Sequence, residues 1–158
     1  MISKIVILGA GKSGVGAAIL GKKKGYDVFV SDKKDIDENL KDFLNRQGIQ
    51  WEAGKHSIEA MKSADFIIKS PGISSDSYII KKLIHEGKDI ISEIEFASRF
   101  TSAILIGITG TNGKTTTTML TYKILKDAGL NVGIAGNIGD SFAFQVAKND
   151  FDYYVLEI

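Results

Sequence analysis

Residues 5–14 read Ile-Val-Ile-Leu-Gly-Ala-Gly-Lys-Ser-Gly, an apolar run that passes directly into a glycine-rich turn. The four apolar residues predict a strand buried on both faces, as in the centre of a parallel sheet. Gly9 permits a tight turn, Gly11 lets a ligand phosphate approach the backbone, and Gly14 lets the following helix pack on the strand. Free N–H groups at the start of that helix would face an anion, so the stretch predicts a Rossmann-like nucleotide-binding unit.

Outward from this turn, apolar strands alternate with segments of helical period. We expect strands near residues 28–30, 49–51, 65–69 and 90–91, and helices around residues 15–19, 40–44 and 79–84. The alternation predicts parallel strands joined by right-handed crossovers, with helices on both faces of the sheet. We assign residues 1–93 to this α/β domain.

A carboxylate stands where a Rossmann-like unit uses one. Asp32 ends the second expected strand about 20 residues beyond the glycines, where it can reach a ribose or a base edge. The glycines do not specify the nucleotide, because a dinucleotide and a nucleotide-sugar diphosphate ask for the same geometry. An NAD(P)-binding oxidoreductase or regulatory module therefore stays open, as does a glycine turn that binds nothing.

A second phosphate-binding pattern, Thr-Gly-Thr-Asn-Gly-Lys-Thr-Thr at residues 109–116, follows the apolar run at 103–108. Successive backbone N–H groups in such a loop form a nest for phosphate oxygens. Lys114 would bring a positive charge to the β- and γ-phosphates, and the Thr115 hydroxyl can ligate Mg²⁺. The loop departs from the strict P-loop pattern, since Ile108 stands where that pattern has glycine.

Further expected strands at residues 132–135 and 152–158, a helical connector at 93–100 and a helix through residues 120–128 place the loop in a second α/β domain that begins near residue 94. Glu157 lies at the end of the last strand, as expected of a second Mg²⁺ ligand beside a P-loop. Taken alone, a glutamate near a chain end is more often solvated. Because the chain stops inside an expected strand, we expect residues 94–158 to be the truncated start of a P-loop ATPase domain.

Composition narrows the function classes. The 158 residues carry 20 basic and 19 acidic side chains, and the net charge of +1 argues against a nucleic-acid-binding surface. The absence of cysteine excludes disulfides and thiolate zinc sites. No apolar run approaches the ~18–20 residues of a membrane span, and no signal peptide is visible, so we expect a cytoplasmic protein without membrane insertion. His56 and His85 are assigned no role.

Seven motifs, in one order, resemble the Mur ligases of peptidoglycan synthesis, and the resemblance runs from residue 4 to residue 158. They are Gly-Ala-Gly-Lys-Ser-Gly (9–14), Ser-Asp-Lys-Lys (31–34), Lys-Ser-Pro-Gly-Ile (69–73), Ser-Glu-Ile-Glu-Phe (92–96), Ile-Thr-Gly-Thr-Asn-Gly-Lys-Thr-Thr (108–116), Gly-Asn-Ile-Gly (136–139) and Tyr-Val-Leu-Glu-Ile (154–158). The first and third favour the branch of the family that adds D-glutamate to UDP-N-acetylmuramoyl-L-alanine.

The resemblance implies that residues 1–93 bind the UDP part of the substrate rather than NAD. The implied substrate-binding residues are Gly11, Lys12 and Ser13 along the diphosphate, Asp32 and Lys33 at the uracil, Gly72 near it, and Asn137 from the next domain. The implied ATP-binding residues are Gly110, Thr111, Asn112, Gly113, Lys114, Thr115 and Thr116. Lys114 would also be catalytic, and Thr115 and Glu157 would hold Mg²⁺. Lys12 and Lys33 replace residues that are frequent in the family, so their side-chain contacts are less secure than backbone ones.

The implied chemistry is ATP-dependent amide-bond formation. The alanine carboxylate is activated as an acyl phosphate, which the amine of D-glutamate then attacks. Such a site has to neutralise phosphate charge and align the reactants, and it needs no nucleophilic side chain. D-Glutamate would bind to a later domain, so we expect this chain alone to bind UDP weakly and not to ligate. We also expect a monomer. A sister Mur ligase for another amino acid and a non-catalytic phosphate-binding module remain alternatives.

Overall fold

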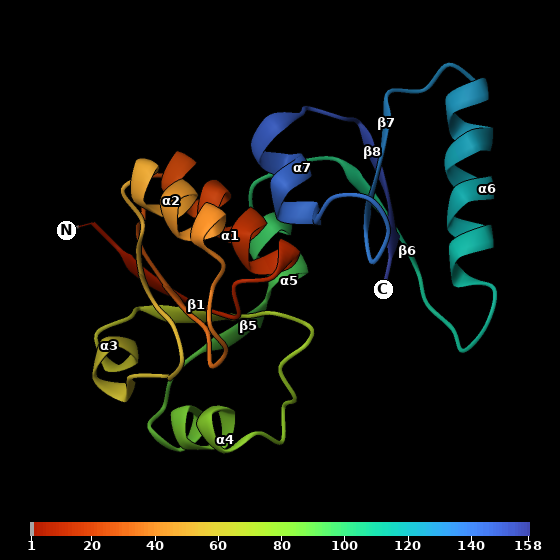
Figure 1. Cartoon of the computed structure of the whole chain (residues 1–158). Helices are drawn as coiled ribbons and strands as arrows, with labels where there is room; N and C mark the ends of the chain where they lie inside the picture. The colour runs from red at the N-terminus through yellow and green to blue at the C-terminus, as the bar shows by residue number, and fades with distance from the viewer. Residues whose placement is uncertain (1) are drawn as a thin grey trace.

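The computed structural model describes residues 2–158 and contains two parallel sheets (Figure 1). The first sheet consists of β1 (Lys4–Leu8), β2 (Asp27–Ser31), β3 (Gln50–Glu52), β4 (Phe66–Lys69) and β5 (Ile90–Ser92). Its strand order is β3-β2-β1-β4-β5, with every neighbouring pair parallel. A central first strand flanked in this order is the Rossmann arrangement, so the predicted fold class is confirmed.

Helices cover both faces of this sheet. They are α1 (Lys12–Lys23), α2 (Glu38–Arg46), α3 (Ile58–Lys62), α4 (Tyr78–His85) and α5 (Glu93–Ser98). Because side chains alternate along a strand, β1 contributes to two apolar clusters. Ile5 and Ile7 join the larger cluster with α1 and α5, and Val6 and Leu8 join the smaller one with α3 and α4. All four side chains are fully buried, as the sequence of β1 predicted.

The second sheet has the order β6-β8-β7, with all pairs parallel. Its elements are β6 (Ile104–Ile108), α6 (Lys114–Asp127), β7 (Val132–Gly136), α7 (Phe142–Lys148) and β8 (Tyr153–Glu157). Figure 1 shows α6 on the side of this sheet that faces away from the first sheet. The apolar side chains Leu120 and Ile124 of α6 are exposed. Within residues 2–158, no helix has both the length and the apolar character required to cross a bilayer.

Two helices, α3 and α7, were not predicted from the sequence, and α7 decides how the two sheets meet. It packs against α1 and α5 of the first unit. Phe142 of α7 and Tyr154 of β8 belong to the same buried cluster as Ile5 and Leu20, so one core runs across both units. A Cβ added at Gly16 of α1 would overlap the Ser141 hydroxyl at the start of α7, which shows how closely the two helices approach.

A buried carboxylate crosses the same contact. Glu93, the first residue of α5, is only 3% exposed, and its Oε1 accepts a hydrogen bond from the backbone N–H of Ala143 in α7. Burial raises the pKa of the Glu93 carboxyl to about 7, against the opposing effect of the Ala143 N–H. Glu93 therefore links the first unit to the start of α7 and titrates near neutral pH.

We expect Gly16→Ala to lower the free energy of unfolding by ~1–3 kcal/mol, because the added methyl group overlaps the start of α7. Helix propensity alone would change stability in the opposite direction, by about 1 kcal/mol. Urea unfolding monitored by circular dichroism measures the difference. Gly72→Ala is the matched control, because its added Cβ has no neighbour within 4 Å. A stabilised Gly16→Ala variant would contradict the close α1–α7 packing.

The second expectation concerns pH. An acid whose pKa is raised on folding stabilises the fold in its protonated form, so this contribution is complete below the ordinary value of 4.5 and is lost as pH rises through about 7. We expect wild type to lose on the order of 2–3 kcal/mol relative to Glu93→Gln over this range, since a tenfold change in proton affinity is worth about 1.4 kcal/mol. Glu95→Gln, an exposed change on the same helix, should run parallel to wild type. Parallel curves for Glu93→Gln would show that the carboxylate is not desolvated.

Candidate functional site

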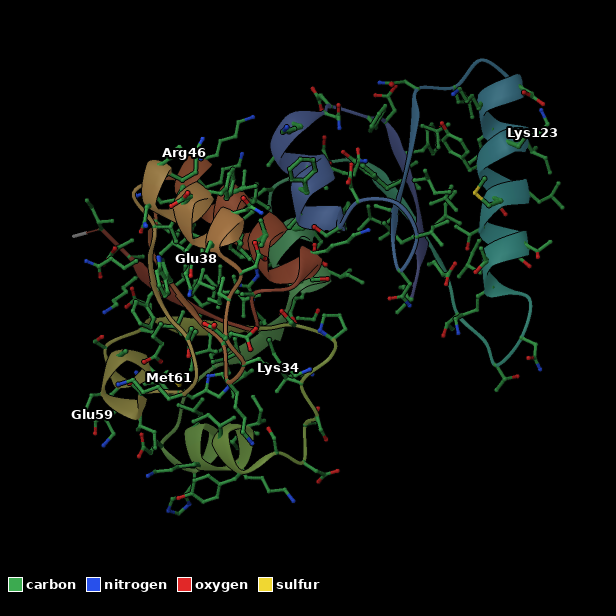
Figure 2. The ribbon with its side chains drawn as sticks, viewed as in Figure 1. Lys34, Glu38, Arg46, Glu59, Met61 and Lys123 are labelled. Carbon is green, nitrogen blue, oxygen red and sulfur yellow. The ribbon has the colours of Figure 1, made fainter. Side chains whose placement is uncertain are left out.

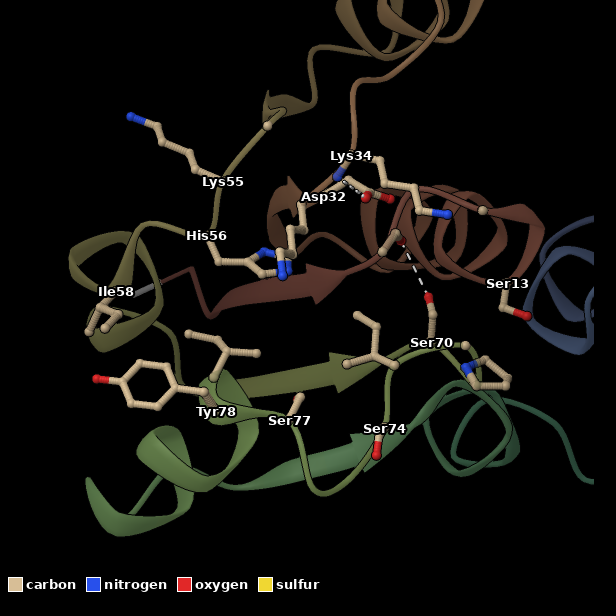
Figure 3. Close-up of a pocket in the computed structure, with 18 of the residues that line it drawn as sticks. Ser13, Asp32, Lys34, Lys55, His56, Ile58, Ser70, Ser74, Ser77 and Tyr78 are labelled. Atoms are coloured by element: carbon tan, nitrogen blue, oxygen red, sulfur yellow. Dashed lines mark hydrogen bonds between the residues drawn. The ribbon is translucent and has the colours of Figure 1, made fainter.

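A cavity of about 780 Å³ opens at the carboxyl ends of β1, β2 and β4, in the size range of small-molecule sites (Figure 3). Ligands of open parallel sheets bind at this edge. The turns after these three strands line about half of it: Gly9, Gly11 and Ser13 after β1; Asp32, Lys33 and Lys34 after β2; and Ser70, Pro71, Gly72 and Ile73 after β4. Asn137, from the loop between β7 and α7, reaches the same cavity from the second unit.

The glycines of the first turn have separate tasks. Gly9 has φ 95°, a conformation that side chains rarely adopt, and a Cβ at Gly14 would overlap the Gly9 carbonyl oxygen. These two glycines shape the turn itself. A Cβ at Gly11 would meet no atom within 4 Å, and no side chain caps the start of α1 there. The structure therefore leaves space and uncapped N–H groups at Gly11, where the sequence predicts a phosphate.

Asp32 fastens this turn to the end of β2. Its Oδ2 accepts the Ala10 N–H at 2.7 Å and its Oδ1 accepts the Lys34 N–H at 2.8 Å. Ser70, the residue after β4, donates its hydroxyl to the Gly9 carbonyl at 3.3 Å, as the dashed line in Figure 3 marks. Asp32 is thus a structural anchor at the cavity wall, and the contact with uracil implied for it remains a prediction.

A second polar network lies behind the wall of the cavity. The Ser31 hydroxyl is buried and lies 2.7 Å from Glu52 Oε1 and 2.7 Å from His56 Nδ1. Burial on its own would raise the pKa of Glu52, but hydrogen bonds from Ser57 and Ser31 and the charge of Lys55 hold it below its ordinary value. Burial lowers the pKa of His56, and the nearby carboxylates only partly oppose this. At neutral pH the network therefore contains an ionised Glu52 and a neutral imidazole.

Two buried side-chain oxygens lack any hydrogen-bond partner among residues 2–158, and each lies at a predicted ligand site. Ser77 Oγ belongs to a residue that lines the cavity, at the start of α4. Glu157 Oε2 lies at the end of β8, where 7% of the residue is exposed. Buried polar atoms are normally paired, so an unpaired one is a place where a ligand, an ion or a water molecule can bind. An unpaired carboxylate oxygen fits the Mg²⁺ role that the family resemblance implies for Glu157.

The loop between β6 and α6 is open and pre-shaped. Gly110 has φ 151° and Gly113 has φ 73°, and Gly113 starts α6 without a side-chain cap. Lys114 Nζ donates to the Gly110 carbonyl at 2.8 Å, so the ammonium folds over its own loop. Thr111, Asn112, Thr115 and Thr116 are exposed. Among the described residues no cluster of three acidic, histidine or cysteine side chains could hold a metal, so Thr115 and Glu157 remain the candidate protein ligands.

The structure brings most of the predicted substrate-binding residues together. Gly11, Ser13, Asp32, Lys33, Gly72 and Asn137 line one cavity, whereas Lys12 is exposed and is not among the lining residues. Sequence reasoning missed His56 and Ser77, which line the same cavity. The signal for His56 was its place just after β3, at the same sheet edge as Asp32. Ser77 offered no comparable signal, because it follows no strand.

Comparison with known proteins matches both units. The model of the MurD N-terminal domain matches residues 4–79, and that of the Mur ligase middle domain matches residues 108–158. The UDP-N-acetylmuramoylalanine–D-glutamate ligase of Bacteroides fragilis is 57% identical over 157 residues, which are 99% of this chain and 35% of the relative. The ligase of the same name from Christiangramia forsetii is 51% identical over 158 residues, with 100% and 36% covered. The chain thus spans about a third of the length of these relatives.

Solved structures of peptide ligases have a similar fold along nearly the whole chain. A murein peptide ligase from Psychrobacter arcticus superposes with a TM-score of 0.60 at 25% identity, over 98% of this chain and 37% of that one. A pseudomurein peptide ligase type C from Methanothermus fervidus gives a TM-score of 0.58 at 34% identity, over 99% and 33%. The two family matches follow one another along the chain and together take up most of it. The relatives are similar along its whole length. The chain belongs to the Mur ligase family.

Proposed function

We propose that this chain provides the UDP-substrate site and the ATP-phosphate loop of a ligase that adds D-glutamate to UDP-N-acetylmuramoyl-L-alanine. The observation that carries the proposal is the cavity in which the open turn at Gly11 and Asn137 of the second unit face one space. A ligand held there by the first unit also touches the unit that carries the ATP loop. That arrangement suits a reaction between two separately bound phosphorylated reactants.

The proposal gives the residues of the two loops different roles. Backbone N–H groups at Gly11 and the start of α1 would hold the diphosphate, and Asp32 and Lys33, which line the same cavity, would meet the uracil. Lys114 and the N–H groups of its loop would hold the ATP phosphates, with Thr115 and Glu157 on Mg²⁺. Mg²⁺-bound ATP supplies the phosphoryl group that activates the substrate carboxylate. The protein's part is to neutralise phosphate charge and to align the reactants, which requires no nucleophilic side chain.

The relatives are about three times as long as this chain, and we propose that D-glutamate binds to a part of the protein that these 158 residues do not include. We expect no ligation from this chain alone. The boundary between the UDP-binding and ATP-binding units near residue 93, the monomeric state and the cytoplasmic location belong to the same proposal.

The first test is a glycine replacement that leaves the fold intact. Gly11→Val places a side chain where the structure has free space, so we expect little change in melting temperature. UDP binding, measured by calorimetry, should weaken by roughly tenfold or more, because the side chain would take the space of a phosphate. Gly25→Ala is a control for strain outside the site: Gly25 has φ 84°, so the added Cβ should lower the melting temperature, but it lies outside the cavity and should leave UDP affinity unchanged.

The same titration separates the candidate functions. Binding of UDP to wild type that Gly11→Val weakens by roughly tenfold or more supports the proposal. Binding of NAD in preference to UDP would favour the oxidoreductase or regulatory alternative. Equal UDP affinity in wild type and Gly11→Val would show that the turn does not hold the diphosphate.

The second test concerns the ATP loop. Lys114→Ala removes the ammonium that lies over the loop, and we expect the affinity for Mg²⁺–ATP to fall by about tenfold or more. Lys123→Ala is the matched control, because Lys123 lies on the same helix (Figure 2) and its one ion pair within residues 2–158 is with Asp127, at 2.9 Å. Binding of a fluorescent ATP analogue measures both variants. Equal losses would mean that the effect comes from the net charge of α6 rather than from the loop.

A further inference from the structure

The hydrogen-bond network of Ser31, Glu52 and His56 determines which ring nitrogen of His56 carries the proton. The Ser31 hydroxyl has a single proton and lies 2.7 Å from both Glu52 Oε1 and His56 Nδ1. An ionised carboxylate can only accept, and the Lys55 carbonyl is farther from the hydroxyl, at 3.4 Å, so the hydroxyl proton goes to Glu52. The contact with His56 is then a hydrogen bond only if Nδ1 carries a proton and donates it to Ser31 Oγ. A neutral imidazole protonated at Nδ1 has a bare lone pair at Nε2.

Several features stabilise this state. Glu52 Oε1 also accepts the Ser57 N–H at 2.7 Å, which fixes the carboxylate behind Ser31. The charged groups that act on His56 are Asp32, Glu52 and Lys33, and burial outweighs the two carboxylates in keeping the ring neutral. His56 lines the cavity, and its Nε2 makes no hydrogen bond to any residue of the described part of the chain. Figure 3 shows the ring at the cavity wall, near Asp32 and opposite Tyr78. The cavity therefore contains a fixed hydrogen-bond acceptor.

We propose that His56 Nε2 accepts the N3–H of the uracil ring and so makes the cavity select uridine over cytidine nucleotides. This inference rests on the proposed UDP site and adds a specificity residue to it. Uracil carries a proton at N3, whereas the same atom of cytosine is an unprotonated acceptor. An unprotonated Nε2 can accept a hydrogen bond from the N3–H of uracil. It would face the N3 lone pair of cytosine without forming a hydrogen bond. Ser31 and Glu52 are positioning residues, because they act on the base only through His56.

The binding test compares three nucleotides and three proteins. Wild type should bind UDP roughly tenfold or more tightly than CDP or N3-methyl-UDP, because these two cannot donate at N3. In His56→Asn the side-chain amide can still donate to Ser31, but the acceptor in the cavity is lost, so UDP and CDP affinities should become equal. His56→Gln can place an amide oxygen near the former Nε2, so preference for UDP should be partly restored. Calorimetry of the chain as it stands gives all nine affinities.

A second measurement reads the proton directly and needs no ligand. The chain has two histidines, so a His85→Gln variant leaves His56 as its single imidazole. A long-range ¹H–¹⁵N correlation spectrum distinguishes a ring protonated at Nδ1 from one protonated at Nε2. We expect the Nδ1–H form in this variant, and a loss of that preference when Ser31→Ala is added.

The outcomes separate this inference from the proposed function. Loss of UDP preference in His56→Asn, together with the Nδ1–H form, supports the role of His56. If UDP binds and Gly11→Val weakens its binding, but His56→Asn still prefers UDP to CDP, the inference is wrong and the UDP site stands. An Nε2–H form in the spectrum overturns it as well. If neither UDP nor CDP binds to wild type, the proposed site and the inference fail together.

Discussion

A single steric constraint underlies the first unit: β1 must pass into α1 without covering the N–H groups at the start of the helix. The close approach of Gly14 to the Gly9 carbonyl leaves no room for a side chain, and Gly9 adopts a positive φ. Asp32 and Ser70 then tie the turn to the neighbouring strands β2 and β4. Packing and hydrogen bonds within the protein therefore fix the conformation of the turn and leave open space at Gly11.

The contact between α1 and α7 is the second determinant of the site. It puts the loop between β7 and α7 at the mouth of the cavity, and Asn137 with it. Gly16 permits the approach, and Glu93 receives the N–H of Ala143 across it. A shift of α7 would thus move Asn137 relative to Gly11, which lines the same cavity. Packing between the units and the composition of the binding site are linked by the same few residues.

The two glycine-rich loops, residues 9–14 and 109–116, are each proposed to hold a phosphate group, but their surroundings differ. At the first, the anion would lie in a cavity whose far wall carries the network of Ser31, Glu52 and His56. At the second, the loop is exposed and its cation, Lys114, is bonded to its own backbone. The unpaired oxygens of Ser77 and Glu157 mark where each setting lacks a partner. In the proposed function both loops would bind phosphate through backbone N–H groups, which any residue can provide, so selectivity would have to come from the surrounding side chains.

The sequence by itself determined the Rossmann-like class and the two strand–turn–helix loops, because apolar runs and glycines required by tight turns are local signals. The same signals led to the prediction that Gly11, Asp32 and Lys114 are site residues. It did not reveal α7, whose short apolar segment is stabilised by contacts with α1 and α5 rather than by its own periodicity. It also left His56 without a role. Only the tertiary structure brings the end of β3 beside β2, so that Ser31 and Glu52 can orient the His56 ring. Ser31 lies 21 residues from Glu52 and 25 residues from His56, and local sequence patterns do not encode contacts over such separations.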